Sequence, residues 1–285
     1  MKTAVTIAGE NAKESAYAVW RGFEQSIRKA SEYGYDGVEL ALKDADEINW
    51  NSLRKWLSEY GMEVSCITTG QIFADRGLYF THPDLAMRKK TIAVFSGLID
   101  LAEEFGGLVN AGRTRGFIAP NQTREETEKF FVDTMQVLCD RAASKRVQLI
   151  IEPVNRYEIN FINNLDEGSA LMEKVQRENC GLHADVFHMN IEDDCIGESL
   201  IRNGKWVRYV HFADSNRLAP GLGHLDFDEI FRALKQLQYD GWISVEILPG
   251  ENPDDMARKA ISYIRPKVIA YNDKSKHALV KGEKS

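Results

Sequence analysis

The sequence has little of what marks several special classes of protein. It has four cysteines without CxxC spacing, so neither a disulfide scaffold nor a thiolate metal site is indicated. With 7 prolines and 21 glycines, it is not a collagen-like or linker-rich chain. No apolar run approaches the roughly 20 residues of a membrane span, and the first residues lack the apolar stretch of a signal peptide. We therefore expect a cytoplasmic protein without a membrane partner.

The sequence also lacks an excess of positive charge. Lys and Arg number 36 against 43 Asp and Glu, a formal net charge of −7 that argues against a nucleic-acid partner. What it does have is material for a core, since 44% of its residues are hydrophobic and 5 Trp, 10 Tyr and 13 Phe are present. The composition favours an enzyme or a small-molecule binder.

Short β-branched runs alternate with longer amphipathic segments along the chain. The predicted strands are Thr3–Ala8, Gly37–Leu42, Val64–Thr69, Leu108–Gly112, Gln148–Val154, Leu182–Val186, Val207–Ala213 and Trp242–Leu248. The predicted helices are Arg21–Tyr33, Trp50–Tyr60, Pro83–Phe105, Arg124–Ser144, Leu165–Gln176, Asp226–Gln238 and Pro253–Tyr271. Eight units of about 35 residues predict a single (β/α)8 barrel over residues 1–272, followed by a polar, frayed tail over residues 273–285. A doubly wound sheet is the alternative, but no GxGxxG follows the first strand.

Ionisable residues end four consecutive predicted strands. They are Glu152 in LIIEP, Asp185 in HADVF, His211 in YVHFA and Glu246 in SVEIL. At one height on adjacent barrel strands these side chains converge on the axis, where three carboxylates without a counter-ion would repel one another. A divalent cation removes that conflict, and Mn²⁺, with Mg²⁺ or Co²⁺ as alternatives, suits such a ligand set. The competing interpretation is four separate buried polar residues, each satisfied by its neighbours.

The segments around these residues resemble one group of sugar enzymes. EPVNRYE (Glu152–Glu158), ADVFHMNIED (Ala184–Asp193), HFADSNRLAPGLGHLDF (His211–Phe227) and SVEILP (Ser244–Pro249) are similar to motifs of the D-tagatose 3-epimerase group in the xylose-isomerase-like TIM barrel superfamily. The resemblance extends to GVEL around Glu39 and to TTGQ ending at Gln71.

The resemblance implies a metal-dependent isomerase of carbohydrate metabolism, a ketose 3-epimerase. Glu152, Asp185, His211 and Glu246 would bind the metal, and Glu152 and Glu246 would also be the catalytic pair. One glutamate would remove the proton beside the ketone and the other would return a proton to the opposite face of the enediolate. Glu158, His188 and Arg217 match positions of the group that bind the sugar or support the metal ligands, and Gln71 is also expected to bind the substrate. A homodimer or homotetramer acting on a small sugar is expected.

The simplest interpretation of two further residues near these motifs is that they support the site. His183 lies two residues before Asp185 and shares its side of the strand, so core packing or support of a ligand is expected rather than metal binding. Glu39 ends the second strand, where it either reaches the site or supports it from a buried position. The aromatic residues Trp20, Phe23 and Phe73 either roof the pocket or pack in the core, and core packing is the simpler expectation.

The loop after the fourth strand reads NAGRTRG and places two arginines, Arg113 and Arg115, at the expected catalytic rim. Guanidinium groups bind carboxylate or phosphate in bidentate geometry, which favours a sugar acid, although two solvated loop charges explain the sequence equally well. We expect Arg115, beside Gly116, to be the substrate ligand. A subgroup that resembles this chain acts on 5-keto-L-gluconate in inositol catabolism, and a neutral ketose is the alternative.

Other functions remain open at this level. The same superfamily contains lyases such as inosose dehydratase, in which the enediolate loses a hydroxyl group instead of regaining a proton. A metal-dependent nuclease would need more histidines at the strand ends and a basic face. A non-catalytic sugar-binding protein would not need both Glu152 and Glu246.

Overall fold

The computed structural model describes residues 1–14 and 16–282 and has a closed parallel barrel at its centre. Its eight barrel strands are β1 (Lys2–Ala8), β3 (Gly37–Ala41), β4 (Glu63–Thr68), β5 (Leu108–Ala111), β6 (Gln148–Ile151), β7 (Cys180–Asp185), β8 (Val207–Phe212) and β9 (Trp242–Val245). Consecutive strands pair in parallel, and the pairing of β1 with β9 closes the ring. A two-residue strand, β2 (Trp20–Arg21), extends the sheet beside β1. The predicted (β/α)8 barrel is confirmed.

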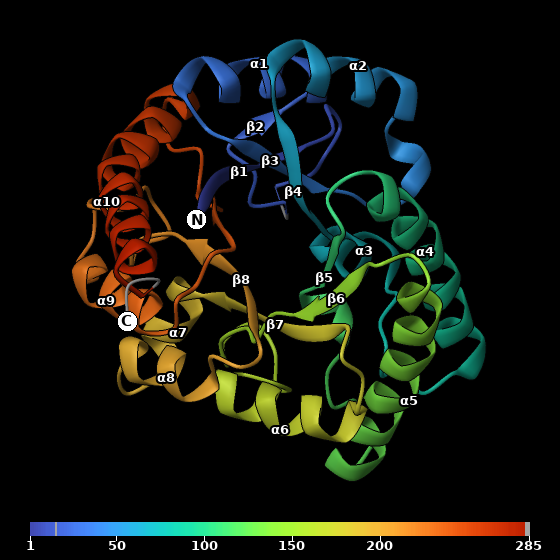
Figure 1. The fold of residues 1–285 in the computed structure, drawn as a ribbon. Helices are drawn as coiled ribbons and strands as arrows, with labels where there is room; N and C mark the ends of the chain where they lie inside the picture. Colours follow the sequence, from blue (N-terminus) through green and yellow to red (C-terminus); the bar gives the residue numbers. More distant parts are fainter. Residues whose placement is uncertain (15, 283–285) are drawn as a thin grey trace.

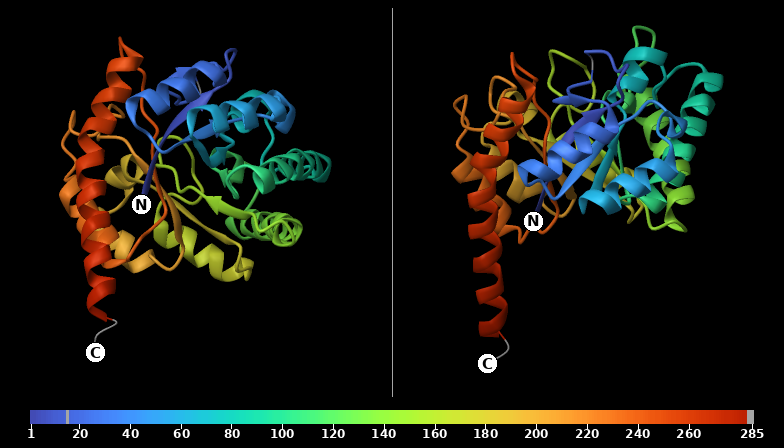
Figure 2. Two further views of the ribbon diagram at one scale, coloured as in Figure 1. Left: turned by 45° about the horizontal axis from the view of Figure 1, so that its top comes forward. Right: turned by 90° about the horizontal axis from the view of Figure 1, so that it is seen from above.

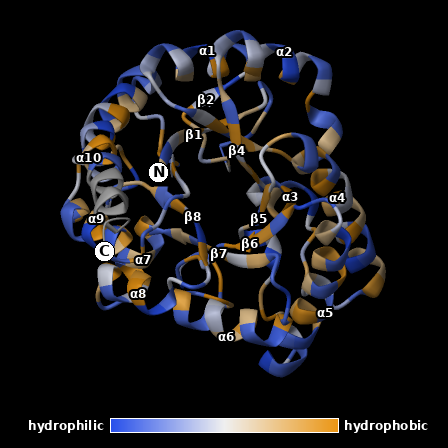
Figure 3. Ribbon diagram, in the orientation of Figure 1, coloured by the Kyte–Doolittle hydropathy of each residue, from blue (hydrophilic) through white to orange (hydrophobic). Residues whose placement is uncertain are grey.

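Helices surround the strands (Figure 1). The long ones are α1 (Phe23–Tyr33), α2 (Trp50–Tyr60), α4 (Leu85–Glu104), α5 (Arg124–Ala143), α6 (Leu165–Val175), α9 (Phe227–Gln236) and α10 (Pro253–Gly282). Shorter ones are α3 (Gly70–Arg76), α7 (Val186–Glu192) and α8 (Ile196–Asn203), with single turns η1 (Ala45–Glu47) and η2 (Arg113–Arg115). Most helix residues are blue or orange in Figure 3, and each long helix has both kinds, as expected for helices with one face on the barrel and one in solvent.

Local sequence explains why the elements begin where they do. Asn49 caps α2 by accepting a hydrogen bond from the backbone of Ser52. Thr123 and Glu126 form the predicted capping box at the start of α5. Every residue of β3 is buried, as is typical of a parallel strand covered on both faces. The barrel interior is therefore packed, and open space is found at its ends.

The end of the chain differs from the prediction of a frayed tail from residue 273. Helix α10 continues to Gly282, and its last turns extend beyond the other helices (Figure 2), while residues 283–285 lie outside the described part. The polar composition of this segment does not prevent a helix, because Lys and Ala have good helix propensity. Among the described residues, no helix is both long and apolar enough to cross a membrane.

Candidate active site

Four of the predicted site residues lie at the carboxyl ends of adjacent strands. Asp185 on β7 is the register partner of His211 on β8, and His211 is in turn level with Ser244 on β9. Glu246 follows Ser244 by two residues and so points to the same side of the sheet. Glu152 comes directly after the last residue of β6. The structure thus brings together Glu152, Asp185, His211 and Glu246 in one cluster.

The geometry of this cluster fits a metal ion. Nδ1 of His211 lies 3.6 Å from a carboxylate oxygen of each of Glu152, Asp185 and Glu246. Two ligands about 2.1 Å from one tetrahedral ion are about 3.4 Å apart, close to these separations. Nδ1 of His211 is buried and has no hydrogen-bond partner among the described residues, so its lone pair is available to an ion. The oxygen-rich donor set with one imidazole suits a hard divalent cation.

The electrostatics of the cluster also favour a positive charge. Burial by itself lowers the pKa of His211, but the carboxylates of Glu39, Asp185 and Glu152 raise it well above its usual value. A proton on His211 and a bound cation are two ways of neutralising the same group of carboxylates. Loading with metal is therefore favourable once the imidazole gives up its proton.

Glu39 supports His211 from the opposite side. Its Oε2 lies 2.7 Å from Nε2 of His211 and accepts hydrogen bonds of 3.1 Å from the hydroxyls of Thr6 and Tyr209. A proton on Nε2 directed at Glu39 leaves Nδ1 free to bind metal. Of the two alternatives open for Glu39, the structure has the supporting position, with no exposed surface.

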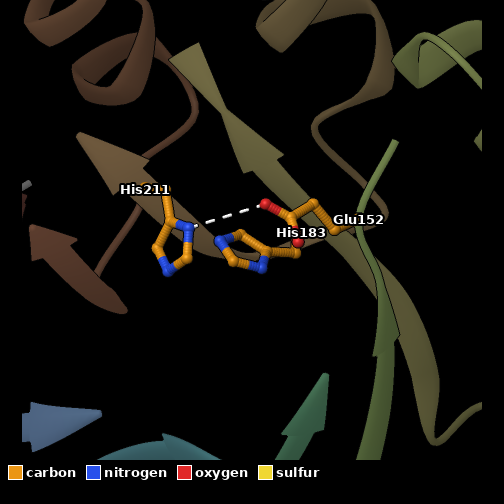
Figure 4. Close-up of side chains that lie close together, drawn as sticks. All are labelled: Glu152, His183 and His211. Carbon is orange, nitrogen blue, oxygen red and sulfur yellow. Dashed lines mark ion pairs between the residues drawn. The ribbon is translucent and has the colours of Figure 1, made fainter. Parts of the chain in front are cut away.

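His183 lies beneath this cluster. Its ring packs edge-on against that of His211, with centroids 3.9 Å apart, and Figure 4 shows both rings beside the Glu152 carboxylate. Burial, with the neighbouring His211, lowers the pKa of His183 to about 4, so it is neutral at neutral pH. A set of Glu152, His183 and His211 could also hold an ion, but the set with Asp185 and Glu246 supplies four ligands and opens toward the pocket.

Arg217 bridges two of the acidic residues. Its guanidinium donates to Asp185 at 2.6 Å and also to Glu246. It packs between the rings of Tyr17 and Phe187, 5.3 Å and 4.7 Å from the guanidinium carbon. Arg217 therefore lies in the site at its predicted position, and its donors hold two carboxylates of the cluster in place.

A pocket opens above the cluster, and Glu152 and Glu246 line it. Glu158, His188 and Gln71 line it together with Glu152 and Glu246, so these predicted sugar-binding residues lie where a substrate would meet the metal centre. Oε1 of Gln71 is buried without a partner among the described residues, while its Nε2 donates to Ala41 at 3.2 Å.

Sequence reasoning missed the residue that organises this wall. The side-chain amide of Asn155 lies 2.8 Å from Nδ1 of His188 and donates to Glu158 at 3.2 Å. Asn155 follows Glu152 in the EPVN segment, but an asparagine in a loop gave no signal beyond the motif itself. Asn110 on β5 was also missed, and it donates to Glu152 at 3.2 Å.

The structure corrects the expectation for Arg115. Its side chain has no exposed surface and donates to the backbone oxygens of Gly112, Phe161 and Ile162 at 2.8 to 2.9 Å. Burial lowers its pKa to about 9, which still leaves it charged at neutral pH. Arg115 does not line the pocket, because the η2 turn directs it inward; it ties the loop after β5 to the loop after β6. Arg113 lines the pocket instead.

The three aromatic residues that were considered as a cover for the pocket lie outside it. Trp20 is buried against Tyr33 and donates to Asp254, and Phe73 packs edge-on against Tyr79 and Phe117. Phe23 lies in a separate surface groove. None of the three lines the pocket above the metal centre, which agrees with the simpler expectation of packing.

A parallel eight-stranded barrel with a carboxylate-rich ion site at the carboxyl ends of its strands defines a class of TIM barrel enzymes. The model of the "Xylose isomerase-like TIM barrel" family matches residues 27–267, and the chain belongs to this family.

Named relatives agree with this assignment. The chain is 31% identical over 264 residues to an L-ribulose 3-epimerase of Methylomonas sp. (strain DH-1), a match that covers 86% of this chain and 91% of the relative. It is 28% identical over 230 residues to a ketose 3-epimerase of Arthrobacter globiformis, with 79% and 77% covered. The crystal structure of a D-allulose 3-epimerase from Methylomonas sp. in complex with D-allulose superposes with a TM-score of 0.80 at 28% identity, over 94% of this chain and 97% of the other.

Proposed function

We propose that this protein is a metal-dependent epimerase that inverts the carbon next to the ketone of a ketose or a keto-sugar acid. The observation that carries the proposal is the convergence of Glu152, Asp185 and Glu246 on Nδ1 of His211 at the floor of a pocket. The similarity to named 3-epimerases supports the same reaction.

In this proposal, the two glutamates transfer the proton. Glu152 follows β6 and Glu246 follows β9, so they reach the pocket from strands separated by β7 and β8. A substrate between them presents one face to each carboxylate. One removes the proton from the carbon beside the ketone, and the other returns a proton to the opposite face. A divalent cation, held by Glu152, Asp185, His211 and Glu246, would supply polarisation of the substrate carbonyl, and we propose Mn²⁺ with Mg²⁺ or Co²⁺ as alternatives.

The remaining pocket residues orient the sugar and the carboxylates. His188 is held through Nδ1 by Asn155, which leaves its Nε2 to face the pocket and a substrate oxygen. Glu158 is oriented by the same amide. Arg217 holds Asp185 and Glu246 in position by direct contacts with both carboxylates. It also lines the same pocket.

A lyase is the second candidate, because a deprotonated intermediate can lose a hydroxyl group instead of regaining a proton. The pairing of Glu152 with Glu246 favours epimerisation, which needs one proton-transfer group for each face. An inosose dehydratase would instead give a deoxy or unsaturated product.

Incubation of the Mn²⁺-loaded protein with a panel of ketoses and keto-sugar acids in D₂O tests the proposal. We expect a 3-epimer product that carries deuterium at the carbon beside the carbonyl. A deoxy product would establish the lyase, and the absence of any product or deuterium exchange across the panel would contradict both.

The proposal also includes a cytoplasmic location and an oligomeric state. All four cysteines are free, which is consistent with the reducing cytoplasm. We propose a homodimer or homotetramer, and light scattering on the purified protein measures the assembly directly.

A further inference from the structure

His183 is a polar side chain in the floor of the site that the proposed reaction does not use. It has no exposed surface, and neither of its ring nitrogens has a hydrogen-bond partner in the part of the chain that the structure describes. Buried polar groups in native proteins normally have a partner, which can be another side chain, a water molecule or an ion. The unpaired nitrogens of His183 therefore indicate a ligand at this position.

The neighbouring donor atoms indicate that this ligand is a cation. One ligand atom from each of Glu152, His183 and His211 lies within 4.8 Å of the other two. Figure 4 shows the His183 ring beside the Glu152 carboxylate and the His211 ring, and Nδ1 of His211 is 3.6 Å from Oε1 of Glu152. Two ligands about 2.1 Å from one tetrahedral ion are about 3.4 Å apart, so small shifts of these side chains close the set around an ion.

We propose that Glu152, His183 and His211 form a second, inner position for a divalent cation, and that this position selects Zn²⁺. Two imidazoles and one carboxylate, with a water molecule as the fourth ligand, are a recurrent coordination set of zinc. The outer set with Asp185 and Glu246 supplies three carboxylates and one imidazole, which suits a hard cation such as Mn²⁺ better. The inference goes beyond the proposed reaction, because it concerns which cation the protein holds and where.

The inner and outer positions share two of their ligands. Glu152 and His211 belong to both sets, and Nδ1 is the free nitrogen of His211 because its Nε2 lies 2.7 Å from Glu39. An ion at one position therefore excludes an ion at the other. Of the three inner ligands in the described chain, Glu152 alone lines the pocket, so the inner ion is held mainly by residues beneath it.

X-ray absorption at the zinc edge tests the inner position. The protein is stripped of metal with a chelator and loaded with one equivalent of Zn²⁺. We expect scattering from two imidazoles around zinc in the wild type and from one in His183→Met. An anomalous difference map of zinc-loaded wild-type crystals should have its peak beside the ring of His183. Scattering from a single imidazole in the wild type, or a peak between Asp185 and Glu246, would overturn the inference whether or not the variant folds.

The ratio of the dissociation constants for Mn²⁺ and Zn²⁺ measures the selectivity. We expect His183→Met to lower Kd(Mn²⁺)/Kd(Zn²⁺) by at least about tenfold, mainly through weaker zinc binding, because the imidazole that is lost is a ligand of zinc alone. His224→Gln is the matched control, since Nδ1 of His224 lies 2.9 Å from the hydroxyl of Ser215, outside the cluster. Its ratio should equal that of the wild type. An unchanged ratio in His183→Met, or an equal loss for both cations, would show that His183 only packs against His211.

Competition between the two cations tests whether the positions exclude each other. Electron paramagnetic resonance distinguishes bound from free Mn²⁺, and we expect one Mn²⁺ to be released for each Zn²⁺ that binds. The same release from His183→Met should need at least about tenfold more free Zn²⁺. Retention of Mn²⁺ beside bound Zn²⁺ would contradict the shared ligands. These measurements need no sugar, so their failure would leave the proposed epimerase function standing, and a lack of epimerase activity would leave the zinc position standing.

Discussion

The two halves of the barrel contribute differently to the site. Strands β6 to β9 carry all four ligand candidates, whereas β1 to β5 carry residues that hold those ligands or line the far wall. Glu39 on β3 supports His211, Asn110 on β5 supports Glu152, and Arg113 follows β5 into the pocket. On the proposed function, the second half supplies the metal ligands and the proton-transfer groups, and the first half holds those side chains in position.

Removal of the metal should have the largest effect on activity and stability. It tests only the candidate ligands of the second half of the barrel. We expect a chelator to abolish activity and to lower Tm, because Glu152, Asp185 and Glu246 then repel one another with less positive charge between them. Mn²⁺ or Co²⁺ should restore both properties. Activity assays and calorimetric melting curves measure the effect, and full activity in protein shown to be free of metal would contradict it.

Arg115 gives the largest stability effect expected in the first half. Arg115→Met removes the charged donor to three backbone carbonyls, of which those of Gly112 and Ile162 keep a backbone N–H donor, and should lower the free energy of unfolding by about 3 kcal/mol. Arg113→Met is the matched variant and should change it by no more than about 0.5 kcal/mol, because Arg113 is partly exposed and its one ion pair, with Glu158, spans 4.0 Å. Urea unfolding of both variants makes the comparison, and similar losses would show that the two arginines are not distinct.

Glu39→Gln tests whether a residue in the first half of the barrel affects metal affinity. The amide keeps the shape of the side chain but removes the charge that orients the imidazole of His211. We expect metal affinity to fall by about tenfold to a hundredfold, the usual effect of altering a group that orients a ligand. Calorimetric titration with Mn²⁺ measures it, and Glu63→Gln, an exposed glutamate on β4 paired with Lys2, is the control. Equal Mn²⁺ affinity in the two variants would show that Glu39 does not support metal binding.

The smallest effect is expected for Asn155, which orients the sugar-binding wall. Asn155→Ala frees His188 and Glu158 and should raise KM by about fivefold to tenfold, the scale of about 1 kcal/mol that one hydrogen bond contributes, with a smaller change in kcat. Steady-state kinetics on the preferred sugar measure the split. A decrease confined to kcat would show that Asn155 acts on the chemical step instead.

The barrel and the metal cluster could be predicted because both depend on regular features of the chain. Strand and helix patterns repeat at a nearly constant interval, and residues at equal heights on adjacent parallel strands must converge. The pairing of Asp185 with His211 in register is the direct result. Helices α3 and α7 have seven residues each, which is too short to show a helical period. The prediction from sequence therefore missed both.

The arginine pair shows where prediction from sequence fails. Arg113 and Arg115 are two residues apart in one loop, and the neighbouring Gly116, which favoured Arg115 in the prediction, does not determine which side chain enters the pocket. The η2 turn decides which one enters the pocket, and the acceptors for Arg115 come from the loop after β6, more than 40 residues away. A contact between distant loops depends on the whole fold, so a local pattern does not encode it.

The central claim is that Glu152 and Glu246 transfer protons on opposite faces of one carbon. Its most direct test is deuterium exchange in D₂O, measured by mass spectrometry on each of two 3-epimers with the Glu152→Gln and Glu246→Gln variants at saturating Mn²⁺. We predict that each variant loses at least about a hundredfold in epimerisation rate. Each should retain exchange with only one epimer, the two variants with opposite epimers. Epimerisation by either variant at nearly the wild-type rate would contradict the account.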